Sequence, residues 1–447
     1  MLNKIFNSKT IALIGATDRS GSVGLGISKN LLAGRSLRKI FFVNPNKAKV
    51  LGHKTYDSVL EIKEKVDLAI IAVPAKVVPL VVRQAVEKQV GSLIVISAGF
   101  AETGKKGKML QEQIAKLAKE TQTPLLGPNC LGIISPRLKL NASFAPAMPR
   151  AGSIAFISQS GALIDSMIDR SLKENYGFST IVSYGNEAGV ELCDILDWLK
   201  SDSETKVVAL YLEGVKQGSN FIKSATQLAK IKPVFVLKAG KSEAGKKAAL
   251  SHTAFLSSPS EIYSAVFKQT GLVEVETLTE LFNNSKAMAW QPRCKNGIGI
   301  VTNGGGVGVL MVDYCQNMGI KLSKLEPKTI RLLEKSKVMH QGYSKRNPLD
   351  IVGDALSERY LVAIESLLSQ DNISGIIVAQ TFQIMTEVEK NAKIMLRAKK
   401  KYPKKPIIAC FMGGKFTQSG IDLLEKGRIP NYFDPKHAVS AMRALIK

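Results

Sequence analysis

The sequence has few histidines, no paired cysteines and no long apolar run. Because its cysteines form no CxxC pair, it gives no sign of a metal site or of a disulfide framework. No apolar run approaches the ~20 residues that cross a bilayer, and the polar N-terminus is too short for a signal peptide. We therefore expect a cytoplasmic protein. We expect its five cysteines to be small, buried, apolar residues: Cys130, Cys193, Cys294, Cys315 and Cys410.

Acidic residues are scarce relative to basic ones, 37 against 62, which gives a formal net charge of +25. Such an excess suits nucleic acid, an anionic membrane or phosphorylated ligands. The lysines are spread along the chain, and no zinc finger, RNP sequence or recognition helix accompanies them. We therefore expect neither a nucleic acid nor a membrane as partner. The charge suits an acidic partner subunit or a polyanionic ligand without identifying either.

Short apolar, β-rich runs alternate with amphipathic helical patterns along the 447 residues, which leave room for about three domains. Strands that are hydrophobic on both faces suit a parallel sheet covered by helices. The prediction is an α/β fold that begins with a doubly wound, Rossmann-like domain. Its expected strands are 10–15, 39–43, 67–73, 92–97 and 124–127, with helices that include 76–90 and 107–120.

Two later parts of the chain repeat one another. Residues 148–169 resemble 291–313, and residues 232–245 resemble 405–420, with a further buried strand between them in each copy. Such repetition indicates sibling domains, which we predict to be flavodoxin-like. Features present in both copies should serve the fold, and features present in one copy are better candidates for chemistry. The expected domains are 1–147, 148–290 and 291–447.

The first strand leads into a glycine-rich turn, 15–32. Such a turn lets backbone amides approach a phosphate at a helix N-terminus, but the spacing is not GxGxxG. A NAD site would also need an acid after the second strand, where the chain has Asn44, Pro45 and Lys47. These residues fit the phosphorylated ribose of CoA better than a free diol. A Rossmann domain with surface lysines is the alternative.

The second domain carries the sequence SQSGAL between a strand and a helix. Ser158, Ser160 and the amides of Gly161 and Ala162 would face an anion at the positive end of that helix. A serine N-cap before a tight glycine turn is the structural alternative. The third domain has TNGGGVG at the same place, so we attribute the glycine turn to the fold and the two hydroxyls to chemistry.

One of the four histidines stands apart. His53, His340 and His437 have structural or surface interpretations, whereas His252 lies in a stretch rich in Gly, Ala, Ser and Lys, 241–259. That composition predicts a mobile polar loop, and the third domain has no histidine at the equivalent place. A neutral imidazole is a competent nucleophile at physiological pH. Its place in the chain therefore sets His252 apart from the other three histidines.

The motifs together resemble those of ADP-forming acyl-CoA (acetyl-CoA) synthetase α subunits, with succinyl-CoA synthetase α subunits as more distant relatives. IALIGATDRSGSVG, FFVNPN, DLAIIAVPA, VISAGF and GPNCLGIISP follow the family's CoA-binding domain in order. The resemblance implies an N-terminal Rossmann-like CoA-binding domain followed by two flavodoxin-like, succinyl-CoA synthetase-like domains. It implies that CoA contacts Gly15, Ala16, Ser22, Val23, Gly24, Asn44, Pro45, Lys47, Val73, Pro74, Ser97, Ala98, Gly99 and Asn129.

The segment KAGKSEAGKKAALSHTAFLSS resembles the family's phosphohistidine loop. The resemblance implies that His252 takes a phosphoryl group from an acyl phosphate and delivers it to ADP, while Glu213 fixes the imidazole tautomer. The family commonly has SHTG, whereas Ala254 and Phe255 follow here and make the loop stiffer or bulkier. Three further residues are expected to line the phosphate pocket beside the helix start: Gly185, Asn186 and Glu187.

The implied activity is that of an acid–thiol ligase that interconverts acyl-CoA, ADP and phosphate with a small carboxylic acid, CoA and ATP. Transfer to the nucleotide needs an ATP-grasp domain, for which the three domains leave no room. We therefore expect ADP or ATP with Mg²⁺ on a separate ATP-grasp β subunit, in an α2β2 assembly. A non-catalytic CoA-binding regulatory or scaffold subunit is the main alternative, and an NAD(P)-dependent oxidoreductase is the other. His252, Glu213 and SQSG argue against the first, and Asn44 argues against the second.

Overall fold

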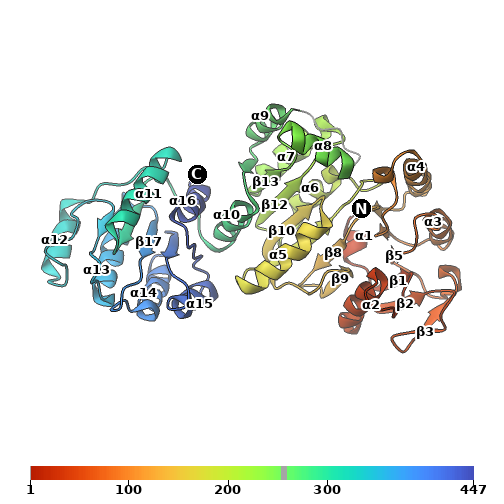
Figure 1. Ribbon diagram of the computed structural model, residues 1–447, viewed down its shortest axis with the longest axis horizontal. Helices are drawn as coiled ribbons and strands as arrows, with labels where there is room; N and C mark the ends of the chain where they lie inside the picture. The colour runs from red at the N-terminus through yellow and green to blue at the C-terminus, as the bar shows by residue number, and fades with distance from the viewer. Residues whose placement is uncertain (1, 253–258) are drawn as a thin grey trace. The chain divides into compact units, whose positions relative to one another are not determined.

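The structure is a computed structural model that describes residues 2–252 and 259–447, with the backbone alone for 248–252. It divides into two compact units, Met1–Glu276 and Thr277–Lys447 (Figure 1). Both units alternate strands and helices along the chain. The predicted α/β class is confirmed. None of the helices in these described ranges is long and apolar enough to cross a membrane.

The first sheet of unit 1 has the order β3-β4-β2-β1-β5-β6-β7 in the described chain. All neighbours pair in parallel except β3 and β4. Its strands are β1 Thr10–Ile14, β2 Lys39–Val43, β3 Lys49–Val50, β4 His53–Tyr56, β5 Leu68–Ile71, β6 Leu93–Val95 and β7 Leu125–Leu126. Its helices are α1 Leu2–Phe6, α2 Val23–Ala33, α3 Val78–Glu87 and α4 Lys105–Glu120, with short 3₁₀ helices η1 Arg35–Leu37, η2 Val59–Glu61 and η3 Ala101–Thr103.

The chain leaves β1 toward β2 on one side and returns to β5 on the other side. The carboxyl ends of β1 and β5 therefore form the switch point where ligands of doubly wound sheets bind. Gly15 follows β1 with φ +97, and a Cβ there would lie 2.3 Å from the carbonyl oxygen of Ala72. The glycine-rich turn thus exists because the two strand ends approach too closely for a side chain.

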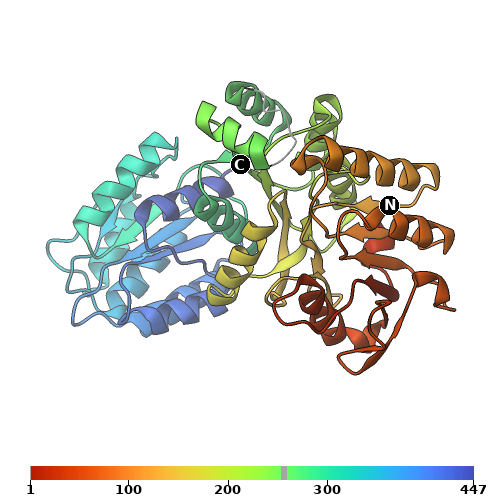
Figure 2. The same ribbon diagram turned by 45° about the vertical axis from the view of Figure 1, so that its right-hand side comes forward.

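The second sheet of unit 1 has the order β14-β13-β12-β10-β11-β8-β9 among the described residues (Figures 1 and 2). Its strands are β8 Gly132–Ser135, β9 Leu140–Ser143, β10 Ala151–Ser158, β11 Phe178–Ser183, β12 Val207–Leu212, β13 Val234–Lys238 and β14 Val273–Val275. Its helices are α5 Gly161–Lys173, α6 Leu192–Ser201, α7 Gly218–Ala229, α8 Glu243–His252 and α9 Ser260–Thr270.

The hairpin β8–β9 differs from the expected division of the chain near 147. β8 pairs antiparallel with β11, so the second sheet begins at Gly132. Strand β7 and the segment after it also accept hydrogen bonds from the second domain. The Asn186 N–H donates to the Pro128 carbonyl at 2.9 Å, and the Val190 N–H donates to the Leu125 carbonyl at 2.7 Å. These bonds explain why both sheets belong to one compact unit.

Unit 2 contains a parallel sheet of order β16-β15-β17-β18 in its described residues. Its strands are β15 Gly299–Thr302, β16 Leu349–Asp350, β17 Ile376–Gln380 and β18 Ile407–Phe411. Its helices are α10 Leu278–Trp290, α11 Gly305–Asn317, α12 Pro327–Lys335, α13 Ser357–Leu368, α14 Val388–Lys401, α15 Gln418–Lys426 and α16 Pro435–Leu445. Helix α10 packs on α16, so this unit begins at Thr277, before the expected boundary at 291.

Candidate functional site

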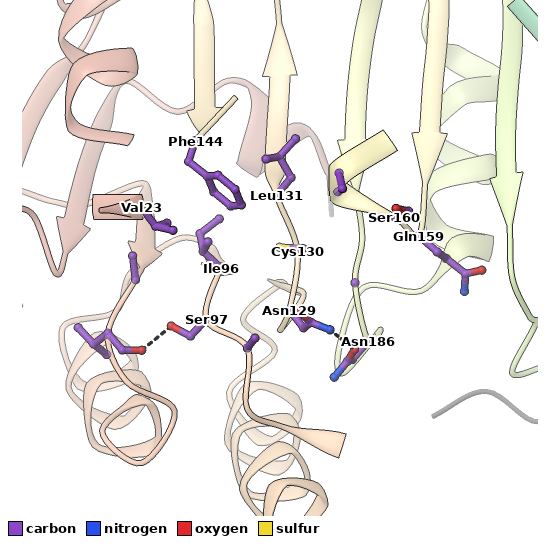
Figure 3. Close-up of a pocket in the computed structure, with 16 residues that line it drawn as sticks. Val23, Ile96, Ser97, Asn129, Cys130, Leu131, Phe144, Gln159, Ser160 and Asn186 are labelled. Atoms are coloured by element: carbon purple, nitrogen blue, oxygen red, sulfur yellow. Dashed lines mark hydrogen bonds between the residues drawn. The ribbon is translucent and has the colours of Figure 1, made fainter. Parts of the chain in front are cut away.

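A cavity of about 480 Å³ opens within unit 1, between the carboxyl ends of the two sheets (Figure 3). Figure 3 shows apolar side chains along one side and Gln159, Ser160 and Asn186 along the other. Such a site suits a ligand with an apolar part and an anionic end. The lining residues are Val23, Ala72, Val73, Ile96, Ser97, Ala98, Asn129, Cys130, Leu131, Phe144, Gln159, Ser160, Gly161, Ala162, Gly185 and Asn186.

A second, larger cavity of about 1050 Å³ follows the switch point of the first sheet and shares Val23, Ala72 and Val73 with the first cavity. A long ligand can therefore run from one cavity into the other. This groove also contains residues that the sequence did not single out. Among them, Thr17 and Arg19 are polar, and the exposed Val77 and Leu80 offer an apolar surface. The predicted CoA contacts along it are Gly15, Ser22, Val23, Gly24, Asn44, Pro45, Lys47, Val73 and Pro74.

Some predicted CoA residues also hold the loops, and of these Ala16 lines neither cavity while Ser22, Asn44 and Lys47 line the larger one. Ala16 is fully buried, and its carbonyl accepts a hydrogen bond from the Asn44 side chain at 2.8 Å. Ser22 caps α2 by accepting from the Leu25 N–H at 3.3 Å. Lys47 forms an ion pair with the carboxylate of Asp18. A ribose phosphate bound by Lys47 would share the ammonium with Asp18, because an ammonium has three donors.

A partly buried polar network joins the two halves of unit 1 beside the first cavity. The Asn186 side chain donates to Glu102 at 2.5 Å and to Gln111 at 3.0 Å, and it accepts from Asn129 at 3.3 Å. Burial would raise the pKa of Glu102. The hydrogen bonds from Asn186 and from the N–H groups of Gly99 and Phe100 outweigh that effect and hold the pKa below its usual value. A charged carboxylate therefore fixes Asn186 at the cavity wall.

The helix start at α5 differs from the expectation in one respect. Ser158 is buried, and its hydroxyl accepts from the Ser160 N–H at 3.1 Å and donates to the Ser160 carbonyl at 2.8 Å. Thr302 makes the same two bonds with Gly304 in unit 2, at 3.0 and 3.1 Å. The Ser158 hydroxyl therefore holds the turn that both copies share, and its predicted role at the phosphate stays a prediction. Ser160 lines the cavity with the start of α5, which Gly161 and Ala162 form.

Gln159 connects this turn to the end of β12. Its side-chain oxygen accepts from the N–H groups of Glu213 and Gly214, and its nitrogen donates to the Gly214 carbonyl at 3.1 Å. Glu213 is 6% exposed. In the register of the two sheets, its counterpart in unit 2 is Thr381. Glu213 is thus a carboxylate that the sibling domain does not have.

A second buried carboxylate, Glu187, lies next to Asn186. Burial raises the pKa of Glu187 to about 8, although the nearby Lys216 lowers it. The Lys216 ammonium donates to the carbonyls of Asn186 and Glu187 at 2.7 and 2.6 Å. Gly185 precedes them with φ +57, and a Cβ there would lie 2.2 Å from the Pro128 carbonyl. The loop that carries Glu187 is therefore held by Lys216 on one side and packs closely against Pro128 on the other.

The predicted phosphohistidine is the last residue of α8, so part of the expected loop is helical. The side chain of His252, and Ala254 and Phe255 entirely, lie outside the described residues. Their contacts with Glu213 and with the start of α5 stay predictions. Of the cysteines, Cys130 lines the cavity; burial raises the pKa of its thiol to about 12, so the thiol is protonated. Cys193 is half-buried, and the other four are buried.

Three segments of the chain match known domain families. Residues 9–136 match the CoA binding domain, residues 151–288 the succinyl-CoA ligase like flavodoxin domain, and residues 298–444 the ligase-CoA domain. The alpha subunit of an ADP-forming acetate–CoA ligase II from Pyrococcus furiosus is 39% identical over 100% of this chain and 98% of its own. The chain belongs to the family of ADP-forming acetate–CoA ligases.

Other members of this ligase family are longer. ADP-forming acetate–CoA ligase I of Archaeoglobus fulgidus is 38% identical over 99% of this chain, which spans 63% of that protein. Among solved structures, a Candidatus Korarchaeum cryptofilum acetyl-CoA synthetase in complex with phosphate and ADP has a TM-score of 0.94 at 34% identity, covering 100% of this chain and 96% of that one. A Pyrococcus horikoshii crystal structure gives 0.89 at 36% identity, with 100% and 98% covered.

Proposed function

We propose that the chain is the α subunit of an ADP-forming acyl-CoA ligase that works through an acyl phosphate and a phosphohistidine. The observation that carries this proposal is that the larger cavity, along the switch point of the first sheet, is continuous with the smaller one. The start of α5 forms the far wall of the smaller cavity. The named relatives support the same activity over their full alpha subunits. The acid is a small carboxylic acid; acetate is the first candidate because several relatives carry it in their names.

The first step joins phosphate to the acyl group. CoA lies in the groove along the switch point, and its thioester reaches the cavity past Val23 and Val73. The amides at the start of α5, with the Ser160 hydroxyl, hold inorganic phosphate at the positive end of the helix. A phosphate oxygen attacks the thioester carbonyl, and the C–S bond breaks. The CoA thiolate takes up a proton, and an acyl phosphate remains.

The second step moves the phosphoryl group to His252. A neutral imidazole nitrogen attacks phosphorus, and the carboxylate of the acid leaves with the bridging oxygen. The other ring nitrogen keeps its proton and donates a hydrogen bond to Glu213, whose charge stabilises the phosphoimidazolium. Asn129, Gly185, Asn186 and Glu187 complete this pocket, and Gly99 anchors the network through Glu102. These roles belong to the proposal.

The third step needs a nucleotide site. We propose that ADP and Mg²⁺ bind an ATP-grasp β subunit, in an α2β2 assembly, and that both subunits act in the cytoplasm. The alpha-subunit names of two relatives support a partner subunit. A β-phosphate oxygen of ADP attacks the phosphohistidine, the P–N bond breaks, and ATP forms with neutral His252.

Self-labelling tests the proposal without the partner. The chain, incubated with acetyl-CoA and ³²P-phosphate, should acquire an acid-labile, base-stable label. His252→Ala should abolish that label, and His340→Ala, a histidine remote in sequence, should leave it intact. Addition of ADP and the β subunit should move the label into ATP. Equal labelling of wild type and His252→Ala would refute the assignment.

A further inference from the structure

Lys238 places a buried ammonium beside Glu213. It is the last residue of β13 and is 4% exposed. Its Nζ donates to the Glu213 carbonyl at 2.8 Å and to the carbonyl of Ala239. It also lies 4.5 Å from the centre of the Tyr263 ring, on α9. One ammonium thus contacts the ends of two neighbouring strands and a helix.

The fold does not require this lysine. Lys238 pairs in register with Leu212, and in unit 2 the corresponding pair is Phe411 with Gln380. The sibling sheet therefore forms with a phenylalanine at this place. Burying an ammonium is unfavourable unless hydrogen bonds and charges compensate. The two strand ends differ together between the copies: Glu213 and Lys238 in unit 1, Thr381 and Phe411 in unit 2.

We propose that Lys238 is a positioning residue for phosphoryl transfer, which holds Glu213 and the turn into α8 in the arrangement that the histidine needs. The inference rests on the proposed function. The Glu213 carbonyl fixes the backbone from which the catalytic carboxylate projects. The Ala239 carbonyl fixes the turn from which α8 runs to His252. Tyr263 belongs to α9, which begins after the segment that follows His252.

The charges around Lys238 explain how it acts. Four charged groups act on it: Glu213 from just after β12, Glu274 from β14, Lys241 from the turn before α8, and Lys246 from the first turn of α8. Burial lowers the pKa of Lys238 to about 8, with the carboxylate of Glu213 opposing that effect. The ammonium is therefore charged below about pH 8 and loses its proton above it. The positioning should weaken over the same range.

The test compares two buried lysines, one at each end of β13. Lys232 precedes the other end of β13 and also donates to two carbonyls, those of Leu199 and Asp202, far along the strand from Glu213. Lys238→Met should lower the rate of His252 self-labelling roughly tenfold or more, the loss expected for a charge-assisted hydrogen bond. CoA affinity should stay unchanged. Lys232→Met should lower the melting temperature as much as Lys238→Met does, but it should leave the labelling rate near that of wild type.

A conservative variant allows a second measurement, the pH dependence of the labelling rate, which a loss of stability alone should not change. Wild-type labelling should fall above about pH 8, whereas Lys238→Arg should keep labelling at higher pH because guanidinium stays charged. If Lys238→Met does not fold, this pH profile decides the matter. Three outcomes would overturn the inference and leave the proposed function standing. They are a wild-type labelling rate in Lys238→Met, equal losses of labelling rate in Lys238→Met and Lys232→Met, and a pH dependence of labelling in Lys238→Arg that matches wild type. Label in His252→Ala would overturn both.

Discussion

Glu187 is a residue whose charge opposes the folded state. Burial raises its pKa to about 8, against an ordinary value of 4.5. The folded chain therefore holds a proton that the unfolded chain releases. The stability from that proton is fully present below pH 4.5 and is lost as the pH rises from 4.5 to about 8.

Replacement of Glu187 by glutamine should remove this pH dependence. The melting temperature of Glu187→Gln should exceed that of wild type by several degrees at pH 8, and the difference should shrink toward pH 5. Thermal unfolding at several pH values measures it. Glu112→Gln, at an exposed carboxylate, should shift neither curve. A difference that is constant with pH would show that the carboxylate is charged throughout.

The sequence indicates the roles of some site residues and not of others. The resemblance to the ligase family points to Glu213, and the register of the strands then shows that unit 2 has Thr381 at that place. For Ser158 the comparison is ambiguous, because Thr302 is a different residue that makes the same bonds in the turn. It also gives no signal for Glu102 or Gln111, which reach Asn186 from a distant part of the chain. The bonds that a hydroxyl makes within a turn, and hydrogen bonds between residues distant in the chain, leave no pattern in the sequence and are found only in the structure.

At the scale of elements, the turn between strand and helix is the structural feature that the two copies share. Gln159 bonds the backbone of Glu213 and Gly214. The side chain of Asn303 makes similar bonds in unit 2. It accepts from the Thr381 N–H at 2.8 Å and donates to the Thr381 carbonyl at 3.0 Å. Both amides are buried. Each therefore joins the ends of the two central strands in its own sheet.

Gln159→Ala and Asn303→Ala should each lower the free energy of unfolding of their own unit by roughly 2–3 kcal/mol, since each loses several buried hydrogen bonds. Gln159→Ala should also slow His252 labelling, because Gln159 lines the cavity and holds Glu213. Asn303→Ala should slow it far less. Denaturant unfolding and the labelling assay separate the two effects. Equal losses of labelling would assign the effect of Gln159 to stability.

Helix α8 shows where composition misleads. Glycine, serine and lysine in 241–259 predict a loop, yet residues 243–252 form a helix. Alanine, leucine and lysine are strong helix formers, and Glu243 lies in the first turn, where a negative charge is favourable. The Ser242 hydroxyl also accepts from the Gly245 N–H at 3.0 Å, as a cap would. These local signals were sufficient to predict the helix.

At the scale of the whole molecule, the sequence predicts the α/β class and the repeat, whereas the division into compact units follows from tertiary packing. Strand cores such as 39–43 are recovered because apolar runs determine them. Boundaries depend on which sheet a strand joins, and β8 joins the second sheet through long-range pairing with β11. Likewise, α10 precedes the repeat in sequence but packs on α16. Pairing partners of this kind leave no local pattern in the chain.

The place of α10 gives a prediction about how the chain divides. The ion pair between Lys286 on α10 and Glu425 has an N···O distance of 3.1 Å, with the side chains 3% and 7% exposed. The Tyr432 hydroxyl donates to the Asn283 carbonyl at 2.7 Å. Removal of α10 would take Lys286 away from a buried carboxylate, which typically costs about 3–5 kcal/mol, and would expose the face of α16 that α10 covers.

Residues 277–447 should therefore fold alone with one cooperative transition, whereas residues 291–447, which begin at the boundary expected from sequence, should be less stable by several kcal/mol. Circular dichroism with urea titration measures the difference. In 277–447, Lys286→Met should recover most of its stability when combined with Glu425→Met, because the double change leaves no lone buried charge. Equal stability of the two fragments would show that α10 is a linker, and the unit would then begin where the repeat does.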